Sequence, residues 1–570
     1  MKKYLFIALA ALGFAACAEN NDGPNAPIHN GELEESYIAI NLMAADNDTR
    51  AAEDTYGYED GTTAERAVKT AYFFFFDANG NPFNVTTSAP GGEKNHLSLT
   101  ISEDTTSGMP NVSDIKNAVL LLNTYKGVYP SKIVAVINWT PVEKTYSLTQ
   151  LHSELATLGN DTNGYVMSNS IYMDGAGKMV DAVALTAANI KTTADAAKDA
   201  PIDIYVERIA AKVVVTGNNV YDTQKDSTPI LTTGQTSKFD VYVKLLGWEL
   251  FNDYSNSTLL KNIDTTWEVT TLGLTWNDIP YYRCYWADSQ NTDPEDNFSW
   301  SYADPTAKGF QTAYGFGIAA AEDEYATRST YTYCGENTNQ VVMNGKKIES
   351  DFRTKVILKG QLMKADSEAE GGYSTLELAR WYGTEYAGNE ALRIAVANSL
   401  KYTLYYKDGE NYVSIKPEDL QCVAGQLVGA EAYEVGFQLS TAGLQKTWYK
   451  YDSTNGYVAS DNLDDANKTA TNTYLKSVEP ALLYTEGQTY YTVDIKHLGA
   501  TGKTAEYGVV RNHVYQIDIE SIKGYGSPVF SGDIGFLKPE FPTEDEASYV
   551  AARINVLSWK VVKQGVDIVQ

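Results

Sequence analysis

Short runs of apolar residues, several of them alternating with polar residues, recur along the chain between turn-forming segments. Such runs predict β-strands, because successive side chains of a strand point to opposite faces of a sheet. Helical periodicity is sparse, and one short helix is predicted within residues 147–158. The pattern predicts an all-β protein. The clearest strand-like runs are residues 70–77 (TAYFFFFD), 132–138, 204–216, 239–250, 354–362 and 514–522.

Two further strand-like segments lie near the ends of the chain. Residues 37–43 (YIAINLM) place Ile38, Ile40 and Leu42 on one face, as in a half-buried strand. Residues 553–570 (RINVLSWKVVKQGVDIVQ) predict a long strand with no partner after it, preceded by a linker rich in proline, glycine and acids at 530–547. A strand near each end suggests a subunit that polymerises by exchanging strands.

The apolar residues of the C-terminal segment fall into two phases. Ile554, Val556, Val562, Val566 and Ile568 share one phase, and Leu557, Trp559 and Val561 share the other. A β-bulge near Val556 and Leu557 would bring the first of these residues onto one face. These eight residues are the predicted donor positions, and the alternative is an ordinary terminal strand that pairs within its own domain.

The first residues predict an export signal. Lys2 and Lys3 precede an apolar stretch, residues 4–16, which is too short to cross a bilayer as a helix. Small residues then stand before Cys17, as in a bacterial lipobox, with Phe14 where leucine is usual. Cys17 is therefore predicted to be lipidated. The alternative is an ordinary secretory signal in which this cysteine is incidental.

Composition narrows the function classes. A chain of 570 residues needs more than one core. Its 41 tyrosines against 5 histidines and 4 cysteines suit an aromatic-rich β protein. The net charge of −28 argues against nucleic acid as a partner, because phosphate binding needs a basic face. Apart from Cys17 the chain has Cys284, Cys334 and Cys422, which allow one disulfide at most, and the sequence does not say which.

The sequence offers no catalytic constellation, so neither an enzyme nor a cofactor or metal is predicted. The histidines are scattered, and no HExxH, GxSxG, phosphate-binding loop or paired CxxC occurs. Residues 77–80 (DANG) superficially resemble a calcium loop, but a hairpin turn explains them better. Aromatic clusters at 402–406 and at Trp381 and Tyr382 are attributed to sheet packing in preference to sugar stacking.

Five short motifs follow one another along the chain: residues 164–170 (GYVMSNS), 206–213 (VERIAAKV), 283–287 (RCYWA), 333–338 (YCGENT) and 507–515 (YGVVRNHVY). Each motif is weak alone, but the order of the set is specific and spans nearly the whole chain. In this order they resemble the motifs of the fimbrillin family of Bacteroidota. The nearest resemblance is to minor fimbrillins, the stalk pilins of type V pili, and Gly335 stands where leucine is usual.

The resemblance implies two transthyretin-like β-sandwich domains with a C-terminal donor strand. Trp248 and Tyr515 are expected in the core of the larger, C-terminal domain. The expected organisation is a lipoprotein signal peptide at 1–17, a propeptide with a removable strand at 18–50, an N-terminal sandwich at 51–210, a C-terminal sandwich at 211–530, and a linker with the donor strand at 531–570.

Family members are exported as lipoproteins, cut after an arginine by a trypsin-like protease, and then polymerised. The resemblance therefore implies cleavage between Arg50 and Ala51, which would free the strand that bears Ile38, Ile40 and Leu42. Arg66 is a competing site that we expect to be protected, because the strand at 70–76 follows it closely.

The expected partners are other copies of the chain, anchor and tip pilins, an Arg-specific protease and a surface ligand of unknown identity. The expected location is the outer membrane for the lipoprotein precursor and an extracellular fimbrium after maturation. The alternatives are a pilus tip adhesin and a surface glycan-binding lipoprotein.

Overall fold

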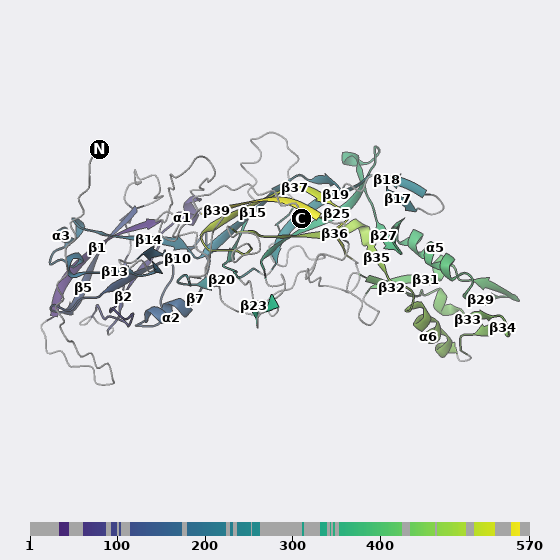
Figure 1. Ribbon diagram of the computed structural model, residues 1–570, viewed down its shortest axis with the longest axis horizontal. Helices are drawn as coiled ribbons and strands as arrows, with labels where there is room; N and C mark the ends of the chain where they lie inside the picture. The colour runs from purple at the N-terminus through teal and green to yellow at the C-terminus, as the bar shows by residue number, and fades with distance from the viewer. Residues whose placement is uncertain are drawn as a thin grey trace.

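The protein forms an elongated molecule with sheets arranged along its length (Figure 1). The N-terminal sheet lies at one end, a pair of facing sheets occupies the middle, and a unit with two helices lies at the other end (Figure 1). The computed structural model describes residues 33–44, 61–86, 93–99, 102–103, 115–173, 179–223, 228–231, 236–251, 253–262, 311–312, 331–338, 342–343, 346–347, 353–424, 434–461, 464–497, 507–529 and 549–558.

The N-terminal sheet has nine strands within the described residues. Its order is β3-β2-β6-β10-β14-β1-β5-β4, and β13 pairs with β6. The strands are β1 (Leu33–Ala44), β2 (Ala71–Phe76), β3 (His96–Leu99), β4 (Ser102–Glu103), β5 (Ile115–Tyr125), β6 (Lys132–Ile137), β10 (Met167–Asn169), β13 (Val183–Ala184) and β14 (Ile202–Arg208).

The unbroken apolar run at 70–77 is explained by burial of β2 on both faces. Phe73 and Phe75 belong to one apolar cluster, with residues of β1, β5, β6 and β14. Phe74 and Phe76 point the other way, into a second cluster with Leu151 and residues 259–260. A strand covered on both faces carries apolar residues at every position, whereas a half-exposed strand alternates.

The middle of the molecule is a sandwich of two sheets. One has the order β22-β15-β37-β39, and the other has the path β16-β19-β25-β36-β38 with β21 and β26 attached. The strands are β15 (Ala210–Gly217), β16 (Val220–Asp222), β19 (Val241–Phe251), β21 (Gln311–Thr312), β22 (Tyr331–Gly335), β25 (Lys355–Ala365), β26 (Tyr373–Thr375), β36 (Gln488–Asp494), β37 (His513–Lys523), β38 (Ser527–Pro528) and β39 (Tyr549–Ser558).

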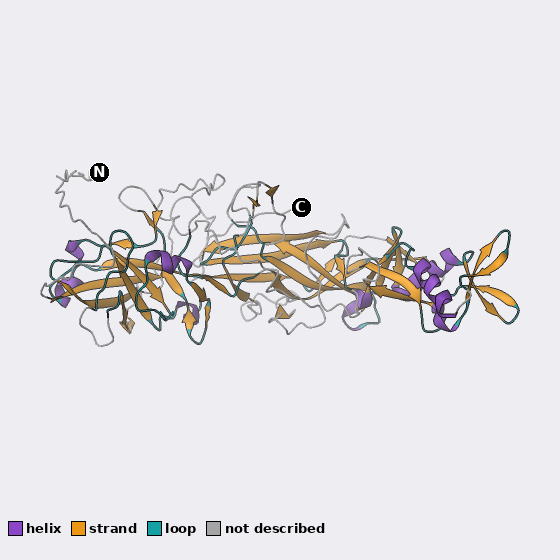
Figure 2. Ribbon diagram, turned by 90° about the horizontal axis from the view of Figure 1, so that it is seen from below, coloured by secondary structure: helices purple, strands orange, loops and turns teal. Residues whose placement is uncertain are grey.

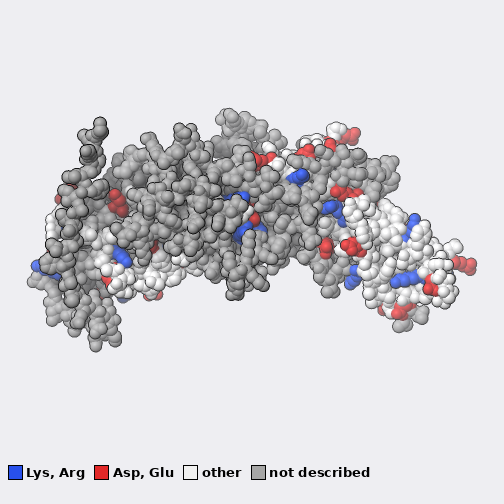
Figure 3. Space-filling view, viewed as in Figure 1, with Lys and Arg blue, Asp and Glu red and all other residues white. Residues whose placement is uncertain are grey.

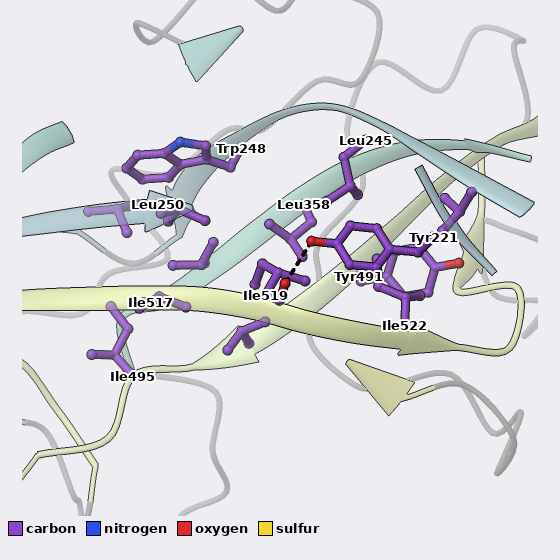
Figure 4. Close-up of a cluster of buried hydrophobic side chains, with 14 of the residues drawn as sticks. Tyr221, Leu245, Trp248, Leu250, Leu358, Tyr491, Ile495, Ile517, Ile519 and Ile522 are labelled. Carbon is purple, nitrogen blue, oxygen red and sulfur yellow. Dashed lines mark hydrogen bonds between the residues drawn. The ribbon is translucent and has the colours of Figure 1, made fainter. Parts of the chain in front are cut away.

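One apolar core fills the space between these two sheets. Figure 4 shows Trp248 and Leu358 from one sheet facing the same core as Ile517 and Ile519 from the other. Trp248 and Tyr515 are fully buried members of this core, as the sequence predicts.

A third core, formed by residues between β25 and β36 in the chain, lies at the far end of the molecule, where β17 and β18 from earlier in the chain extend its sheet. Two hairpins project beyond its helices (Figure 2). Its elements are β17 (Thr228–Leu231), β18 (Thr236–Phe239), β27 (Leu378–Trp381), β28 (Thr384–Ala387), α5 (Gly388–Leu400), β29 (Leu404–Asp408), β30 (Asn411–Ser414), β31 (Leu420–Ala424), β32 (Glu434–Leu439), β33 (Trp448–Asp452), β34 (Gly456–Ala459), α6 (Asp464–Leu475) and β35 (Ala481–Tyr484).

Short elements complete the described part of the chain. The helix expected within residues 147–158 is present as α2, where Ser147 and Gln150 form a reciprocal capping box. These short elements are α1 (Thr63–Arg66), α2 (Leu148–Ser153), α3 (Ala194–Lys198), β7 (Leu155–Thr157), β8 (Gly159–Asn160), β9 (Gly164–Tyr165), β11 (Tyr172–Met173), β12 (Met179–Val180), β20 (Asn256–Thr258), β23 (Val342–Met343), β24 (Lys346–Lys347), η1 (Ala187–Asn189), η6 (Glu370–Gly372), η7 (Pro417–Asp419), η8 (Gly443–Gln445) and η9 (Thr485–Gly487).

The prediction of an all-β protein is confirmed, since strands in several sheets make up most of the described structure and helices are few. The two facing sheets in the middle of the molecule are a β-sandwich. Among the described residues, no helix is long and apolar enough to span a membrane.

Replacing Trp248 by alanine tests the central core. Trp248 is fully buried, so Trp248→Ala should lower the free energy of unfolding by about 3–5 kcal/mol and lower the melting temperature. The control is Tyr402→Ala at a side chain that is 76% exposed, which should leave the melting temperature nearly unchanged. Equal melting temperatures for wild type and Trp248→Ala would contradict the burial.

Candidate assembly site

Strand β1 lies inside the N-terminal sheet, not at its edge. It runs antiparallel to β5, from Leu33 opposite Tyr125 to Met43 opposite Ile115. On its other side it runs parallel to β14, with Ile40 opposite Ile202. β1, the first described segment of the chain, is therefore paired with β5 over Leu33–Met43 and, on its other side, with β14 over Ile40–Ala44.

The predicted face of β1 is buried. Ile38 and Ile40 have no exposed surface and belong to the core that β2, β5, β6 and β14 also line. At the opposite phase, the backbone of Tyr37 exchanges hydrogen bonds with Lys191, with N–O distances of 2.7 and 2.9 Å. The side chain of Leu42 lies outside the described residues, although its backbone pairs with Ile204 and Lys116.

Withdrawal of β1 would open a groove between β5 and β14. The groove would be lined by apolar side chains that β1 now helps to bury, such as Leu120 of β5 and Ile204 of β14. Its two walls would be unpaired strand edges, which readily accept another strand. The site is thus a strand-shaped slot whose occupant is a segment of the same chain.

The C-terminal segment pairs within its own domain as far as it is described. β39 runs antiparallel to β37, with Ile554 opposite Ile517, Val556 opposite Tyr515 and Leu557 opposite Val514. This pairing is regular at Val556 and Leu557, where a bulge was expected. The register shift lies instead on β37, between Ile519 and Ser521. The expectation of a bulge at Val556 and Leu557 is therefore wrong for this pairing.

β39 is the last strand of its sheet, next to β37 (Figure 1). The other side of β37 is paired with β15, so β37 remains in the sheet whether or not β39 is present. The donor positions Trp559, Val561, Val562, Val566 and Ile568 lie outside the described residues, as do the side chains of β39.

The predicted processing residues Cys17, Arg50 and Ala51 also lie outside the described residues. The competing residue Arg66 is described: it is half-buried in α1, whose first turn begins after Thr62. The lipidation and cleavage sites therefore stay predictions.

Other features from the sequence have structural roles. Cys334 and Cys422 are free thiols that form no disulfide, and Cys284 lies outside the described residues. Residues 77–80 form a turn in which Asp77 accepts hydrogen bonds from the backbone of Asn79 and Asn81, at 2.8 and 2.9 Å. No cluster of three or more potential metal-ligating side chains occurs among the residues that are described.

The aromatic clusters divide between core and surface. Tyr406 and Trp381 pack in the third core, whereas Tyr402 and Tyr382 are 76% and 70% exposed. Sheet packing therefore accounts for the inward-facing members of both clusters.

On the face seen in Figure 3, the described acidic and basic side chains are interspersed.

A buried histidine stands where β39 ends. His513 pairs through its backbone with Ser558, and its Nδ1–H donates to the Arg511 carbonyl oxygen at 2.7 Å. Burial and the nearby positive charge of Lys261 lower the pKa of His513 from 6.5 to about 3. His513 is thus neutral in the folded protein at the pH values at which free histidine is protonated.

The C-terminal part of the chain matches a known family model. Residues 482–565 match the model described as major fimbrial subunit protein type IV, fimbrillin, C-terminal. This range holds β36, β37 and β39, and thus includes the last of the five motifs identified in the sequence. No match was found among curated proteins.

Several solved structures are similar over most of this chain at low identity. TM-scores below 0.5 are too low for these similarities to support a function. Three examples are a putative cell adhesion protein from Parabacteroides distasonis (11% identity, 93% of this chain and 100% of that chain, TM-score 0.38), a fimbrilin, FimA, from Porphyromonas gingivalis (12%, 93% and 98%, 0.36), and the tip fimbrial protein Mfa3 from Porphyromonas gingivalis (10%, 92% and 100%, 0.31).

The lowered pKa of His513 predicts acid sensitivity. As the pH falls below 6.5 the unfolded chain takes up a proton at this residue, and the folded chain does not until about pH 3. Stability should therefore decrease from pH 6.5 towards pH 3, with no contribution from His513 above that range. His513→Gln should reduce the difference between the melting temperatures at pH 7 and pH 4.5. Burial also lowers the pKa of His96 to about 4, but His96 is present in both proteins, so its contribution cancels when their melting temperatures are compared.

An unchanged pH dependence in His513→Gln would contradict this account. The slope with pH is the readout, because the substitution can also change stability at neutral pH through packing.

Proposed function

We propose that this chain, which belongs to the fimbrillin family by its residues 482–565, is a fimbrial stalk subunit that polymerises by donor-strand exchange. In this proposal a cut after Arg50 releases β1, and the C-terminal segment of a neighbouring copy fills the groove. The alternatives are a tip adhesin and a surface glycan-binding lipoprotein.

The position of β1 is the observation that carries the proposal. In the chain, β1 ends at Ala44 and α1 begins at Thr63, so one cut in 45–60 separates β1 covalently from everything that follows. Yet β1 is hydrogen-bonded on both sides and contributes Ile38 and Ile40 to the core. Because β1 lies inside the sheet and one cut can detach it from the rest of the chain, it is suited to fill the groove between β5 and β14 only temporarily.

The energetics favour replacement once β1 has left. Each apolar side chain that the groove exposes loses about 1.5–3 kcal/mol of favourable burial free energy, and the two strand edges lose their hydrogen-bonding partners. An incoming strand restores both, as in other cases of β-strand addition. At roughly 3.3 Å per residue, the twelve residues of β1 span about 40 Å.

The C-terminal segment is the proposed donor. It includes β39, which occupies the edge of its sheet and pairs with β37. Residues 559–570 follow it and carry five of the eight predicted donor positions. Residues 530–548 connect β39 to the domain and provide the length needed to reach a neighbour.

Export precedes assembly in this proposal. Lipidation at Cys17 would hold the precursor at the outer membrane, and cleavage between Arg50 and Ala51 by an Arg-specific trypsin-like protease would remove the lipid together with β1. The partners are then other copies of the chain and the anchor and tip pilins of the same surface fimbrium.

Blocking the cut tests whether cleavage triggers assembly. An Arg50→Ala precursor should remain monomeric after trypsin treatment, because β1 keeps its own groove filled. Wild-type protein treated in the same way should form ladders and filaments, seen by gel electrophoresis and electron microscopy. An Arg66→Gln control should be cut at Arg50 and assemble. Filaments of Arg50→Ala as abundant as those of wild type would show that this cut is not the trigger.

Shortening the C-terminus tests the donor. Deleting residues 556–570 should leave a folded subunit that is cut after Arg50 but not extended into filaments. The fold should survive because β37 keeps β15 as a neighbour. Circular dichroism and thermal melting measure folding, and electron microscopy measures assembly. A truncated protein that still forms filaments, or one that loses its C-terminal domain, would count against donation.

A further inference from the structure

Two Arg–Ala bonds compete for the same protease near the N-terminus. Arg50 precedes Ala51, and Arg66 precedes Ala67, so the residues flanking each bond are the same. A trypsin-like enzyme recognises the arginine side chain, so the two residues that form each bond do not distinguish the sites, although Thr49 precedes one arginine and Glu65 the other. Proteases bind their substrates in extended form, so cleavage at Arg66 requires α1 to open.

α1 is a single turn that is capped at both ends. The Thr62 side chain accepts a hydrogen bond from the backbone N–H of Glu65, and the Glu65 carboxylate accepts one from the backbone N–H of Thr62 at 2.5 Å. Beyond it, the Ala67 N–H donates to the Ala64 carbonyl at 3.2 Å. A turn this short has no stability in isolation and depends on tertiary contacts.

Glu65 supplies those contacts. Its carboxylate has no exposed surface, lies 3.0 Å from the Lys212 ammonium and accepts a hydrogen bond from the Tyr333 hydroxyl. Its backbone carbonyl accepts a hydrogen bond from Arg208 Nε at 2.7 Å. One residue of α1 is thus bound by three strands: β14, β15 and β22.

The partners are themselves fixed at the junction between the N-terminal sheet and the middle sandwich. Lys212 is 3% exposed and lies over the Tyr331 ring, 4.3 Å from its centroid. Tyr333 packs on Tyr165 with ring centroids 4.6 Å apart. Burial opposes ionisation of Glu65, but the Tyr333 hydroxyl, the Lys212 charge and the Thr62 N–H outweigh it and keep the pKa of Glu65 below its usual value.

We propose that Glu65 is a positioning residue that decides which arginine is cut: by holding α1 against the junction it protects the Arg66–Ala67 bond and confines maturation to Arg50. The choice of Arg50 rests on the proposed function, whereas protection of Arg66 does not. Opening α1 would expose the Glu65 carboxylate and break its ion pair with the buried Lys212, which is strongly unfavourable.

The protection preserves the site for the incoming strand. A cut after Arg66 would remove α1 together with β1 and leave the new terminus four residues before β2, which begins at Ala71. Residues Arg208 and Lys212 would then lose the contacts that they make with Glu65. Since Arg208 ends β14, one wall of the groove, loss of α1 would disturb the site that cleavage is meant to open.

Limited trypsin digestion of the full-chain precursor measures the two cuts separately. The products that begin at Ala51 and at Ala67 are quantified over time by mass spectrometry and N-terminal sequencing. Glu65→Gln removes the charge that pairs with Lys212, and the rate of cutting after Arg66 should increase roughly 100-fold. The control is Glu143→Gln at an exposed glutamate, which should leave this rate unchanged.

A second variant keeps the test decisive if Glu65→Gln folds poorly. Thr62→Ala removes only the exposed half of the capping box, so cutting after Arg66 should increase about tenfold with little change in melting temperature, and Thr62→Ser should restore protection. If folded Glu65→Gln and Thr62→Ala are cut after Arg66 no faster than wild type, the proposal is wrong.

The two proposals fail in different ways. Suppose the wild-type precursor resists cutting at both bonds and only the variants are cut after Arg66. This result would overturn maturation at Arg50 and would support the role of Glu65.

Discussion

The pairing of β1 with both β5 and β14 is the constraint on which the rest of the N-terminal domain depends. Without β1, the nine-stranded sheet would be two smaller sheets joined by loops, and the core that contains Ile38 and Ile40 would lie open along one side. The same pairing makes β1 replaceable, because backbone hydrogen bonds and an alternating apolar face are properties that many strands share. Stability of the precursor and readiness for assembly thus come from one geometric feature.

The middle sandwich would provide a stable base for the proposed exchange. Its core draws on β15 and β37 from one sheet and on β19, β25 and β36 from the other, and none of these is near a chain end that must move. β39 extends the first sheet at its edge. The buried ion pair between Glu65 and Lys212 joins this sandwich to the segment that follows the proposed cut.

Periodicity and composition predicted the strands that the two main cores need. The run TAYFFFFD predicted the strand β2, and the alternation of Ile38 and Ile40 predicted a half-buried strand, in which both residues have no exposed surface. Trp248 and Tyr515 were placed correctly, since both are fully buried in the core of the middle sandwich.

Two features were missed for different reasons. Helix α5 carries Leu392, Val396 and Leu400 at helical spacing, a signal that was present but was overlooked among the many strands. The contact between Glu65 and Lys212 had no sequence signal, because the partners are far apart in the chain and only the tertiary fold brings them together. The within-chain pairing of β39 was open in the sequence, since a strand and its partner have no fixed separation.

Hydrogen exchange of the backbone amides of β5 and β14 tests the central claim most directly. The measurement compares the uncut precursor, the cut subunit from which β1 has been removed, and the assembled filament. Temporary occupancy by β1 predicts protection in the precursor, loss of protection along the facing edges of β5 and β14 in the cut subunit, and protection again in the filament. Amides of β5 and β14 that stay protected without β1, or that remain exposed in the filament, would contradict it.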